Sequence, residues 1–270
     1  MTQAEHWQFI AKRWSNVGSP LRPIQEDQKN FSDLLNLRTS GPVRALILGV
    51  TPELKNLPWP ENSVVKAIDR SIDMIHAIWP GEKTNAVKGN WLQMPFADES
   101  FDCVLCDGGL HLLEYPDGHQ ALVESIYRVL SSCGFFALRL FALPSEREKL
   151  ADVFSSVERG EIDSFHEFKL RVLMALQTSP QVGVSVRNAY DTIQSWAGGD
   201  FKDLSNRTGW PLEQIQTLES YRDTVSNYHF LSEEESISAL TCGGRFRLLE
   251  RRKGSYRLSQ HCAILLLERT

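Results

Sequence analysis

Short apolar runs alternate with helical patterns between residues 44 and 141, and this rhythm constrains the fold more than any other feature of the sequence. Apolar residues recur at helical spacing in 71–79 and 117–130. The runs that indicate buried strands are 44–49, 64–68, 86–88, 101–106 and 135–141. Strands and helices in this order form a parallel sheet with helices on both faces and right-handed crossovers. The sequence therefore predicts an open α/β sheet.

Two further strands are predicted near the end of the chain. Residues 245–250 and 262–268 have strand character, and we expect them to form an antiparallel pair at the sheet edge. Ser232 and Glu235 have the spacing of a capping box, which indicates a helix over 232–240. Helices are also expected at residues 3–14 and 26–37.

The predicted elements divide the chain into four segments. Residues 1–40 are interpreted as an N-terminal helical extension, and 41–144 as a ligand-binding α/β core. Helical stretches with little strand signal fill 145–230, which we interpret as an insertion that lies over the sheet. Residues 231–270 complete the core with a helix and two strands.

Composition and charge are those of an ordinary soluble globular protein. Hydrophobic residues make up 42% of the 270 residues, and the net charge is -5. An acidic balance argues against a nucleic-acid partner, because phosphate binding needs a basic face. A basic cluster lies in 245–257, but Glu250 interrupts it, and we interpret it as a solvated strand face rather than a polyanion site. We expect no membrane partner, because no apolar run approaches the ~20 residues that span a bilayer.

The five cysteines indicate reduced thiols in a cytoplasmic protein, because their number is odd and their spacing irregular. Cys103 and Cys106 form a C-x-x-C pair, but they lie in a predicted buried strand and not at a helix start. No second pair lies close by in sequence to complete a zinc site. We therefore predict neither redox chemistry nor a metal site.

Polar residues and glycines follow the predicted strands, where ligands bind in open parallel sheets. Gly49 ends the first strand, and Thr51 is placed to cap a helix that begins with Pro52. Such a helix N-terminus could hold an anion, although a plain strand-to-helix turn explains the same residues. Asp69 ends the second strand about 20 residues later, where a carboxylate suits a ribose diol. The alternative role for Asp69 is to cap the following helix.

The stretch 89–102 is the most specific motif in the chain. It reads GNWLQMPFADESFD and resembles the G-D-x-x-x-L-P-F-x-D-x-S-F-D segment of class I S-adenosylmethionine-dependent methyltransferases. That family includes the ubiquinone and menaquinone methyltransferases, and the resemblance extends over 43–141. It implies a Rossmann-like class I methyltransferase fold, with S-adenosylmethionine as the cofactor.

The resemblance assigns the adenosine part of the cofactor to residues after the second and third strands. In that family the residue after the glycine hydrogen-bonds the adenine amino group, which gives this role to Asn90, with Trp91 beside it. An Asn carbonyl can accept from an amine. Asp69 would bind the ribose, and the neighbouring Arg70 belongs to the same predicted site.

The resemblance places the methionine end of the cofactor and the acceptor near Asp107 and Gly108, after the fourth strand. A glycine there lets the backbone approach a ligand closely. Asp107 or His111 could orient or deprotonate the acceptor, although His111 is equally well explained as a packed structural histidine. Trp14 and Arg13 are candidates to close over the methionine end.

The first glycine motif departs from the family pattern of an acidic residue and three glycines, because only Gly49 matches. The acidic residue that would help to bind the cofactor's amino group is absent. This departure motivates an alternative, a non-catalytic S-adenosylmethionine-binding or protein-interaction module. A nicotinamide oxidoreductase is a second alternative, but the G-x-G-x-x-G motif that it needs is missing.

The favoured function is O- or N-methylation of a small-molecule acceptor by in-line displacement. Such enzymes mainly supply position and a dry pocket. The insertion would cover the acceptor as a lid, and its aromatic and polar side chains are Phe165, His166, Phe168, Trp196, Trp210, Tyr221, Tyr228 and His229. Taken singly, each of these is more simply explained as part of the insertion's own core.

Overall fold

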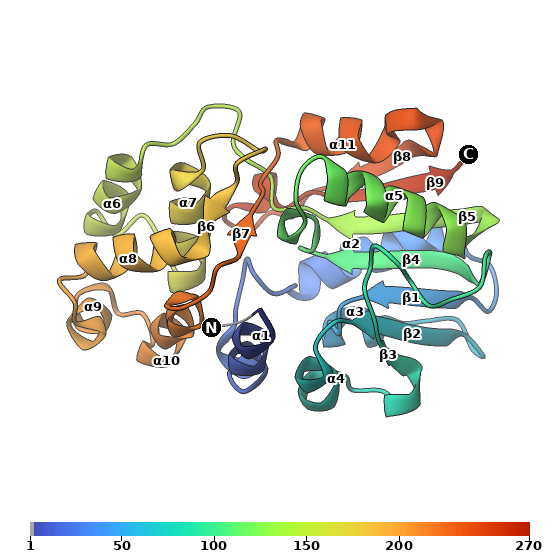
Figure 1. Ribbon diagram of the computed structural model, residues 1–270, viewed down its shortest axis with the longest axis horizontal. Coiled ribbons are helices and arrows are strands. Elements are labelled where there is room, and N and C mark those ends of the chain that lie inside the picture. Colours follow the sequence, from blue (N-terminus) through green and yellow to red (C-terminus); the bar gives the residue numbers. More distant parts are fainter. Residues whose placement is uncertain (1–2) are drawn as a thin grey trace.

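A seven-stranded sheet forms the core of the computed structural model, which describes residues 3–270 (Figure 1). The strand order is β3-β2-β1-β4-β5-β9-β8. The strands are β1 (Arg44–Leu48), β2 (Val64–Asp69), β3 (Ala86–Lys88), β4 (Phe101–Asp107), β5 (Leu130–Arg139), β8 (Phe246–Arg252) and β9 (Ile264–Arg269). The first five pair in parallel, whereas β9 runs antiparallel to both of its neighbours. This topology confirms the predicted Rossmann-like class I methyltransferase fold.

The central strands are buried on both faces, which explains why they appear as continuous apolar runs. Ala45 and Ile47 of β1 face one core, whereas Leu46 and Leu48 face the other. The first face is covered by α1 (Gln3–Ala11), α2 (Gln25–Asn36), α3 (Pro52–Lys55) and α4 (Ile72–Ile78). The second face is covered by α5 (Asp117–Val129) and α11 (Glu233–Thr241).

Two element boundaries differ by more than two residues from the sequence prediction. The first helix ends at Ala11, and a separate 3-10 turn at Trp14–Asn16 replaces its expected last turn. Strand β5 begins at Leu130 and not at residue 135, because Leu130 already pairs with Phe101 across a register shift. The chain therefore passes from α5 into β5 without a loop.

Residues 150–228 form a helical lobe beside the carboxyl ends of the parallel strands (Figure 1). Its helices are α6 (Leu150–Glu158), α7 (Phe165–Leu176), α8 (Val186–Trp196), α9 (Phe201–Thr208) and α10 (Leu212–Ile215). Two short strands that the sequence analysis did not predict, β6 (Val184–Ser185) and β7 (Asn227–Tyr228), pair antiparallel. Phe165, Phe168 and Trp210 are buried in a core of the lobe's own.

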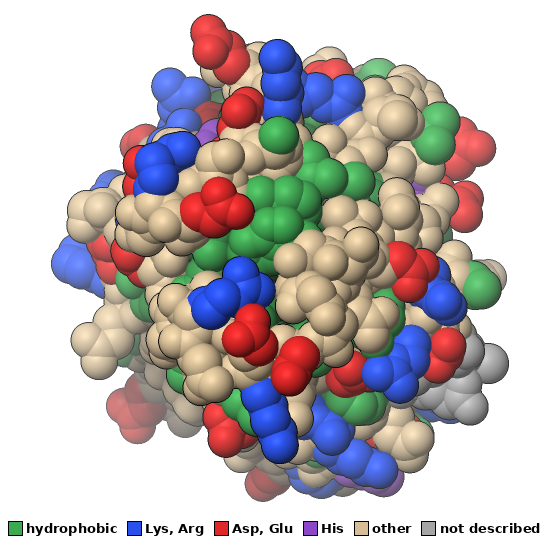
Figure 2. All heavy atoms as spheres, turned by 90° about the vertical axis from the view of Figure 1, so that its left-hand side faces the viewer, with side chains coloured by type: hydrophobic (Ala, Val, Ile, Leu, Met, Phe, Trp, Pro, Cys, Tyr) green, Lys and Arg blue, Asp and Glu red, His purple; other side chains and the backbone are tan. Residues whose placement is uncertain are grey.

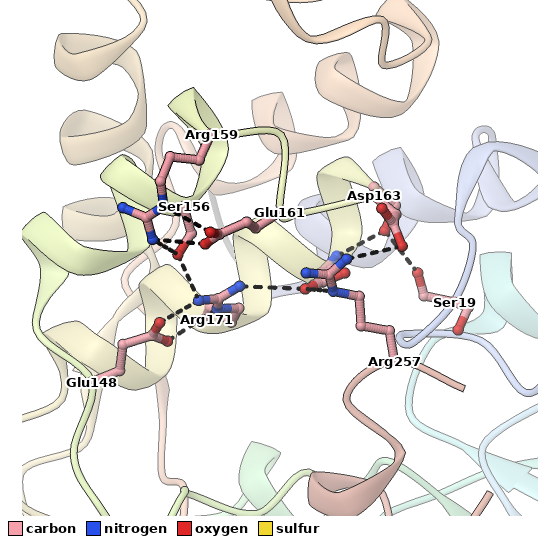
Figure 3. Close-up of polar contacts among 10 residues, drawn as sticks. Ser19, Glu148, Ser156, Arg159, Glu161, Asp163, Arg171 and Arg257 are labelled. Atoms are coloured by element: carbon pink, nitrogen blue, oxygen red, sulfur yellow. Dashed lines mark hydrogen bonds and ion pairs between the residues drawn. The ribbon is translucent and has the colours of Figure 1, made fainter. Parts of the chain in front are cut away.

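Charged side chains tie the lobe to the rest of the chain (Figure 3). Arg171 of α7 donates to Glu148, which precedes α6, and pairs with Glu167 at 3.4 Å. Arg257, from the turn before β9, pairs with Asp163 and Glu167 at 3.2 Å each. This network links the start of α7 to the C-terminal strands.

The outer surface of the lobe end is shown in Figure 2, where hydrophobic side chains gather in the middle of the face and charged ones surround them. Partly buried hydrophobic residues of the lobe core include Phe154, Trp196 and Phe201. In the described part of the chain, no helix has the length and apolar character needed to cross a bilayer.

Candidate active site

A cavity of about 210 Å³ lies where the carboxyl ends of β1, β2 and β4 meet the N-terminal helix and the helical lobe. The sequence-predicted site residues that line it are Trp14, Gly49, Thr51, Asp69, Arg70, Asn90, Trp91, Asp107, Gly108 and His111. The structure thus brings these ten residues to one cavity, although their separate roles stay predictions. Arg13 is not among the lining residues.

The turn after β1 leaves room for a ligand above Gly49. Gly49 has φ +90, and a Cβ built there would come no closer than 3.7 Å to a neighbouring side chain, that of Trp91. The glycine is therefore required by its backbone conformation and not by crowding. Helix α3 begins at Pro52, as expected, but the Thr51 side chain makes no capping hydrogen bond.

Asp69 lies at the carboxyl end of β2, with one oxygen already bonded. Its Oδ1 accepts from the Ser71 backbone N–H at 2.7 Å, while the Ser71 hydroxyl caps α4 by accepting from Met74. The capping role therefore belongs to Ser71. The other oxygen of Asp69 faces Gly49, and burial raises the pKa of Asp69 to about 6.

The residues after β3 build one wall of the cavity. The indole Nε1 of Trp91 donates to the Ile68 carbonyl at 2.9 Å, which fixes the ring between Gly49 and Gly109. The side-chain oxygen of Asn90 accepts from Arg70 and from the Leu92 backbone N–H, each at 3.1 Å. An adenine amino group would have to take the place of Arg70 at this oxygen, which has two lone pairs.

Asp107 ends β4 and belongs to a buried ionic network. Its Oδ1 accepts from Arg139 Nε at 2.5 Å, and Arg139 also pairs with Asp27 of α2 at 3.2 Å. The Tyr256 hydroxyl donates to Asp27 at 2.9 Å. Burial raises the pKa of Asp107, and the Arg139 guanidinium opposes this shift. A carboxylate held in this way is positioned firmly and is poorly placed to accept a proton from an acceptor.

The glycines after β4 make room for side chains of the protein. A Cβ at Gly108 would lie 2.5 Å from the Phe141 ring, and one at Gly109 would lie 2.6 Å from the Cys106 sulfur. Gly108 also has φ +56. The prediction that glycine there permits a close ligand approach thus has a competing explanation in packing.

His111 is packed among aromatic rings at the boundary between core and lobe. Its ring stacks on Phe230 with centroids 5.0 Å apart and meets Tyr228 edge-on at 4.9 Å. Burial lowers the pKa of His111 to about 3. The imidazole is therefore neutral and a weak base, but its buried Nδ1 has no hydrogen-bond partner in the part of the chain that the structure describes.

Trp14 lines the cavity. Its buried Nε1 has no hydrogen-bond partner among the described residues, and the Arg22 guanidinium lies 5.5 Å from its ring centroid. Arg22 in turn pairs with one oxygen of Glu53, whose other oxygen is buried and unpaired. An unused donor and an unused acceptor thus lie on either side of Arg22.

The lobe contributes a residue that the sequence analysis missed. Lys169 of α7 lines the cavity together with Tyr221 and Tyr228. The sequence did contain a signal for Lys169, because it stands between Phe168 and Leu170 on a helix that is apolar on most sides. Lysine is seldom buried in such surroundings.

Comparison with known proteins identifies the α/β segment. Residues 49–138 match the family model described as a methyltransferase domain. No curated protein matches the chain by sequence.

Solved structures share the fold over nearly the whole chain. A Rhodobacter sphaeroides protein described as a Zn-dependent alcohol dehydrogenase is 13% identical, with a TM-score of 0.62 over 99% of this chain and 97% of its own. The N-methyltransferase NodS of Bradyrhizobium japonicum, solved with S-adenosyl-L-homocysteine, is 13% identical, with a TM-score of 0.51 over 97% and 98%. The 1,6-didemethyltoxoflavin-N1-methyltransferase of Burkholderia thailandensis, solved with its substrate and S-adenosylhomocysteine, is 13% identical, with a TM-score of 0.52 over 98% and 89%.

Likeness at this level of identity establishes the fold alone. Within the described residues, no group of three or more His, Cys, Asp or Glu side chains could hold a metal ion. Residues 49–138 match the model of a methyltransferase domain, within a chain that has the Rossmann-like class I methyltransferase fold.

Proposed function

We propose that this protein is an S-adenosylmethionine-dependent methyltransferase that methylates an oxygen or nitrogen of a small-molecule acceptor. The observation that carries the proposal is the cavity at the carboxyl ends of β1, β2 and β4, which are the strands of the segment that matches the methyltransferase-domain model. Ligands of open α/β sheets bind at this edge. The helical lobe covers the same edge and would serve as a lid over the acceptor.

The residues present suit S-adenosylmethionine along the length of the cavity. The Asp69 oxygen that faces Gly49 is placed for the ribose hydroxyls, and Asn90 and Trp91 form the wall beside the adenine position. Thr51 and Arg70 line the same part of the cavity.

The methionine end would be bound by groups that replace the missing acidic residue of the first motif. The unused Nε1 of Trp14 can donate to the cofactor's carboxylate. The unused oxygen of Glu53 can accept from its ammonium group, and Glu53 is close enough to Asp107 for their charges to interact. Buried polar atoms without partners are uncommon, and a ligand would satisfy both.

The chain's own residues would position the acceptor and exclude water. S-adenosylmethionine, when bound, supplies an electrophilic methyl group on a sulfonium. Arg139 fixes Asp107, and the neutral His111 ring lines the cavity with a buried Nδ1 that has no partner among the described residues, so we propose that both residues orient the acceptor. Orientation in a dry cavity is the main catalytic contribution that in-line methyl transfer requires.

Calorimetric titration of the full chain with S-adenosylmethionine and S-adenosylhomocysteine tests the proposal. Both ligands should bind, and Asp69→Ala should weaken both, because the ribose loses its acceptor. Asp73→Ala is the matched control, since it removes a carboxylate from the first turn of α4 outside the cavity lining. A folded wild-type chain that binds neither ligand would refute the assignment.

A further inference from the structure

Lys169 is a cation buried at the wall of the cavity. It lies in the middle of α7 with 3% of its surface exposed. Its ammonium nitrogen donates to the Thr217 hydroxyl at 3.3 Å and lies 5.1 Å from the centre of the Tyr221 ring. A second ring, that of Phe165, lies 5.8 Å away.

No carboxylate among the described side chains balances the charge of this ammonium. Within the described residues Lys169 makes no ion pair, and burial alone lowers its pKa to about 7. His6 and His166 lie near enough to feel its charge, and neither offers a negative one. A buried charge without a partner is costly, whereas an anion at the same place would offset that cost.

The space in front of Lys169 is bounded by flat aromatic surfaces. Tyr221, Tyr228, Phe230 and His111 line the cavity on the lobe side, and their rings contact one another edge-on or stacked. Such walls favour a planar ring, because aromatic side chains bury large areas and prefer edge-to-face or offset stacking with ligand rings.

We propose that Lys169 binds the anionic group of an aromatic acid, and that an aromatic carboxylate is the acceptor class for this cavity. The carboxylate would accept hydrogen bonds from the ammonium beside Thr217, while the ring would lie among the aromatic side chains of the lobe. This inference rests on the proposed methyltransferase function and names its substrate class.

Titration of the full chain, saturated with S-adenosylhomocysteine, with benzoate and with benzamide tests the proposal. The two probes have nearly the same shape, and only benzoate is charged. We expect benzoate to bind at least about tenfold more tightly, because the interaction pairs a buried ammonium with a carboxylate. Lys169→Met should abolish this preference, whereas Lys202→Met, which changes an exposed lysine of α9, should keep it.

A pH series on the wild-type chain tests the same idea without a variant. Benzoate affinity should fall by up to tenfold per pH unit between pH 7 and 9, because the anion needs the protonated amine, whereas benzamide affinity should stay constant. The titratable groups around Lys169 change their protonation outside the range of pH 7 to 9. Burial lowers the pKa of His6, lowers that of His166 to about 3 and raises that of Tyr221.

The proposal is overturned if benzoate binds no more tightly than benzamide, or if neither probe binds. It is also overturned if the Lys169→Met variant still prefers benzoate. A calorimetric titration of the same sample with S-adenosylhomocysteine shows whether the cofactor product binds. Failure of the acceptor proposal is thereby distinguished from failure of the cofactor assignment. If the cofactor product does not bind, the two probes are titrated into the chain without it.

Discussion

Replacement of Arg139 by methionine would remove the cation that pairs with the buried carboxylates of Asp27 and Asp107. The exposed fractions of the Arg139, Asp27 and Asp107 side chains are 0%, 1% and 5%. Loss of one partner from a buried ion pair costs about 3–5 kcal/mol, since an uncompensated charge stays behind. That is a large share of the 5–15 kcal/mol that stabilises typical folded proteins. For a chain of this size it lowers the melting temperature by roughly 10 °C.

The loss of stability in Arg139→Met should depend on pH. Burial already raises the pKa of Asp107, and loss of the opposing guanidinium should raise it further, so the folded variant binds more protons than the unfolded chain over the intervening pH range. Its stability therefore falls as pH rises through that range. We expect the difference from wild type, measured by urea unfolding, to be smaller at pH 5 than at pH 8.

Arg44→Met is the matched control for this experiment. Arg44 also makes an ion pair from a strand, at 2.7 Å to Asp102, but the two side chains are 51% and 35% exposed. An exposed pair contributes about 0–1 kcal/mol. If Arg139→Met destabilises the chain no more than Arg44→Met does, the argument from buried charge is wrong.

Three further predictions concern residues that line the cavity, namely Trp14, Asp69 and Gly108. Trp14→Phe should weaken S-adenosylhomocysteine binding about tenfold in calorimetry while changing the melting temperature little, because Nε1 has no protein partner to lose; a larger change in stability than in affinity would contradict this. Affinity for the same ligand should fall several-fold as pH drops below about 6, where Asp69 takes up a proton, and Asp69→Asn should remove that dependence. Gly108→Ala should cost about 2–4 kcal/mol in urea unfolding, because its Cβ meets the Phe141 ring at 2.5 Å and its φ is +56; an unchanged midpoint would show that the turn adapts.

Much of the core could be predicted because its signals are local. Each strand of the parallel sheet is a short apolar run, and β1 and β2 were placed to within a residue of their observed ends. The two-residue strands β6 and β7 were missed, since a pair this short has no periodicity to detect. The pairing of Leu130 with Phe101, which starts β5 early, is a tertiary contact that local propensity does not encode.

Most of the predicted site residues follow strands, and the structure places them at one cavity, but their bonding partners could not be predicted. Asp107 could be placed at the cavity because β4 ends there, whereas its bond to Arg139 depends on the register between β4 and β5. Asp27 joins them from a helix that precedes the sheet in the chain. Sequence spacing carries no information on contacts among Asp27, Asp107 and Arg139, which are far apart in the chain. The sequence alone could therefore not show that Arg139 occupies the Asp107 carboxylate and makes it a poor base.

Charge is divided across the cavity in a way that suits transfer from a cation to an anion. Asp69 and Asp107 line the part of the cavity that we assign to the cofactor, and Glu53 lies close enough to Asp107 for their charges to interact. Lys169 lines the part that we assign to the acceptor. Opposite charges about 10 Å apart attract by roughly 1–2 kcal/mol at an effective dielectric constant near 20. Benzoate should therefore bind about tenfold more tightly when the cavity holds sinefungin, which has a charged amine in place of the sulfonium, than when it holds S-adenosylhomocysteine. Benzamide should not distinguish the two complexes. Equal benzoate affinities would mean that solvent screens the two ends from each other, and that the lobe does not close the cavity during transfer.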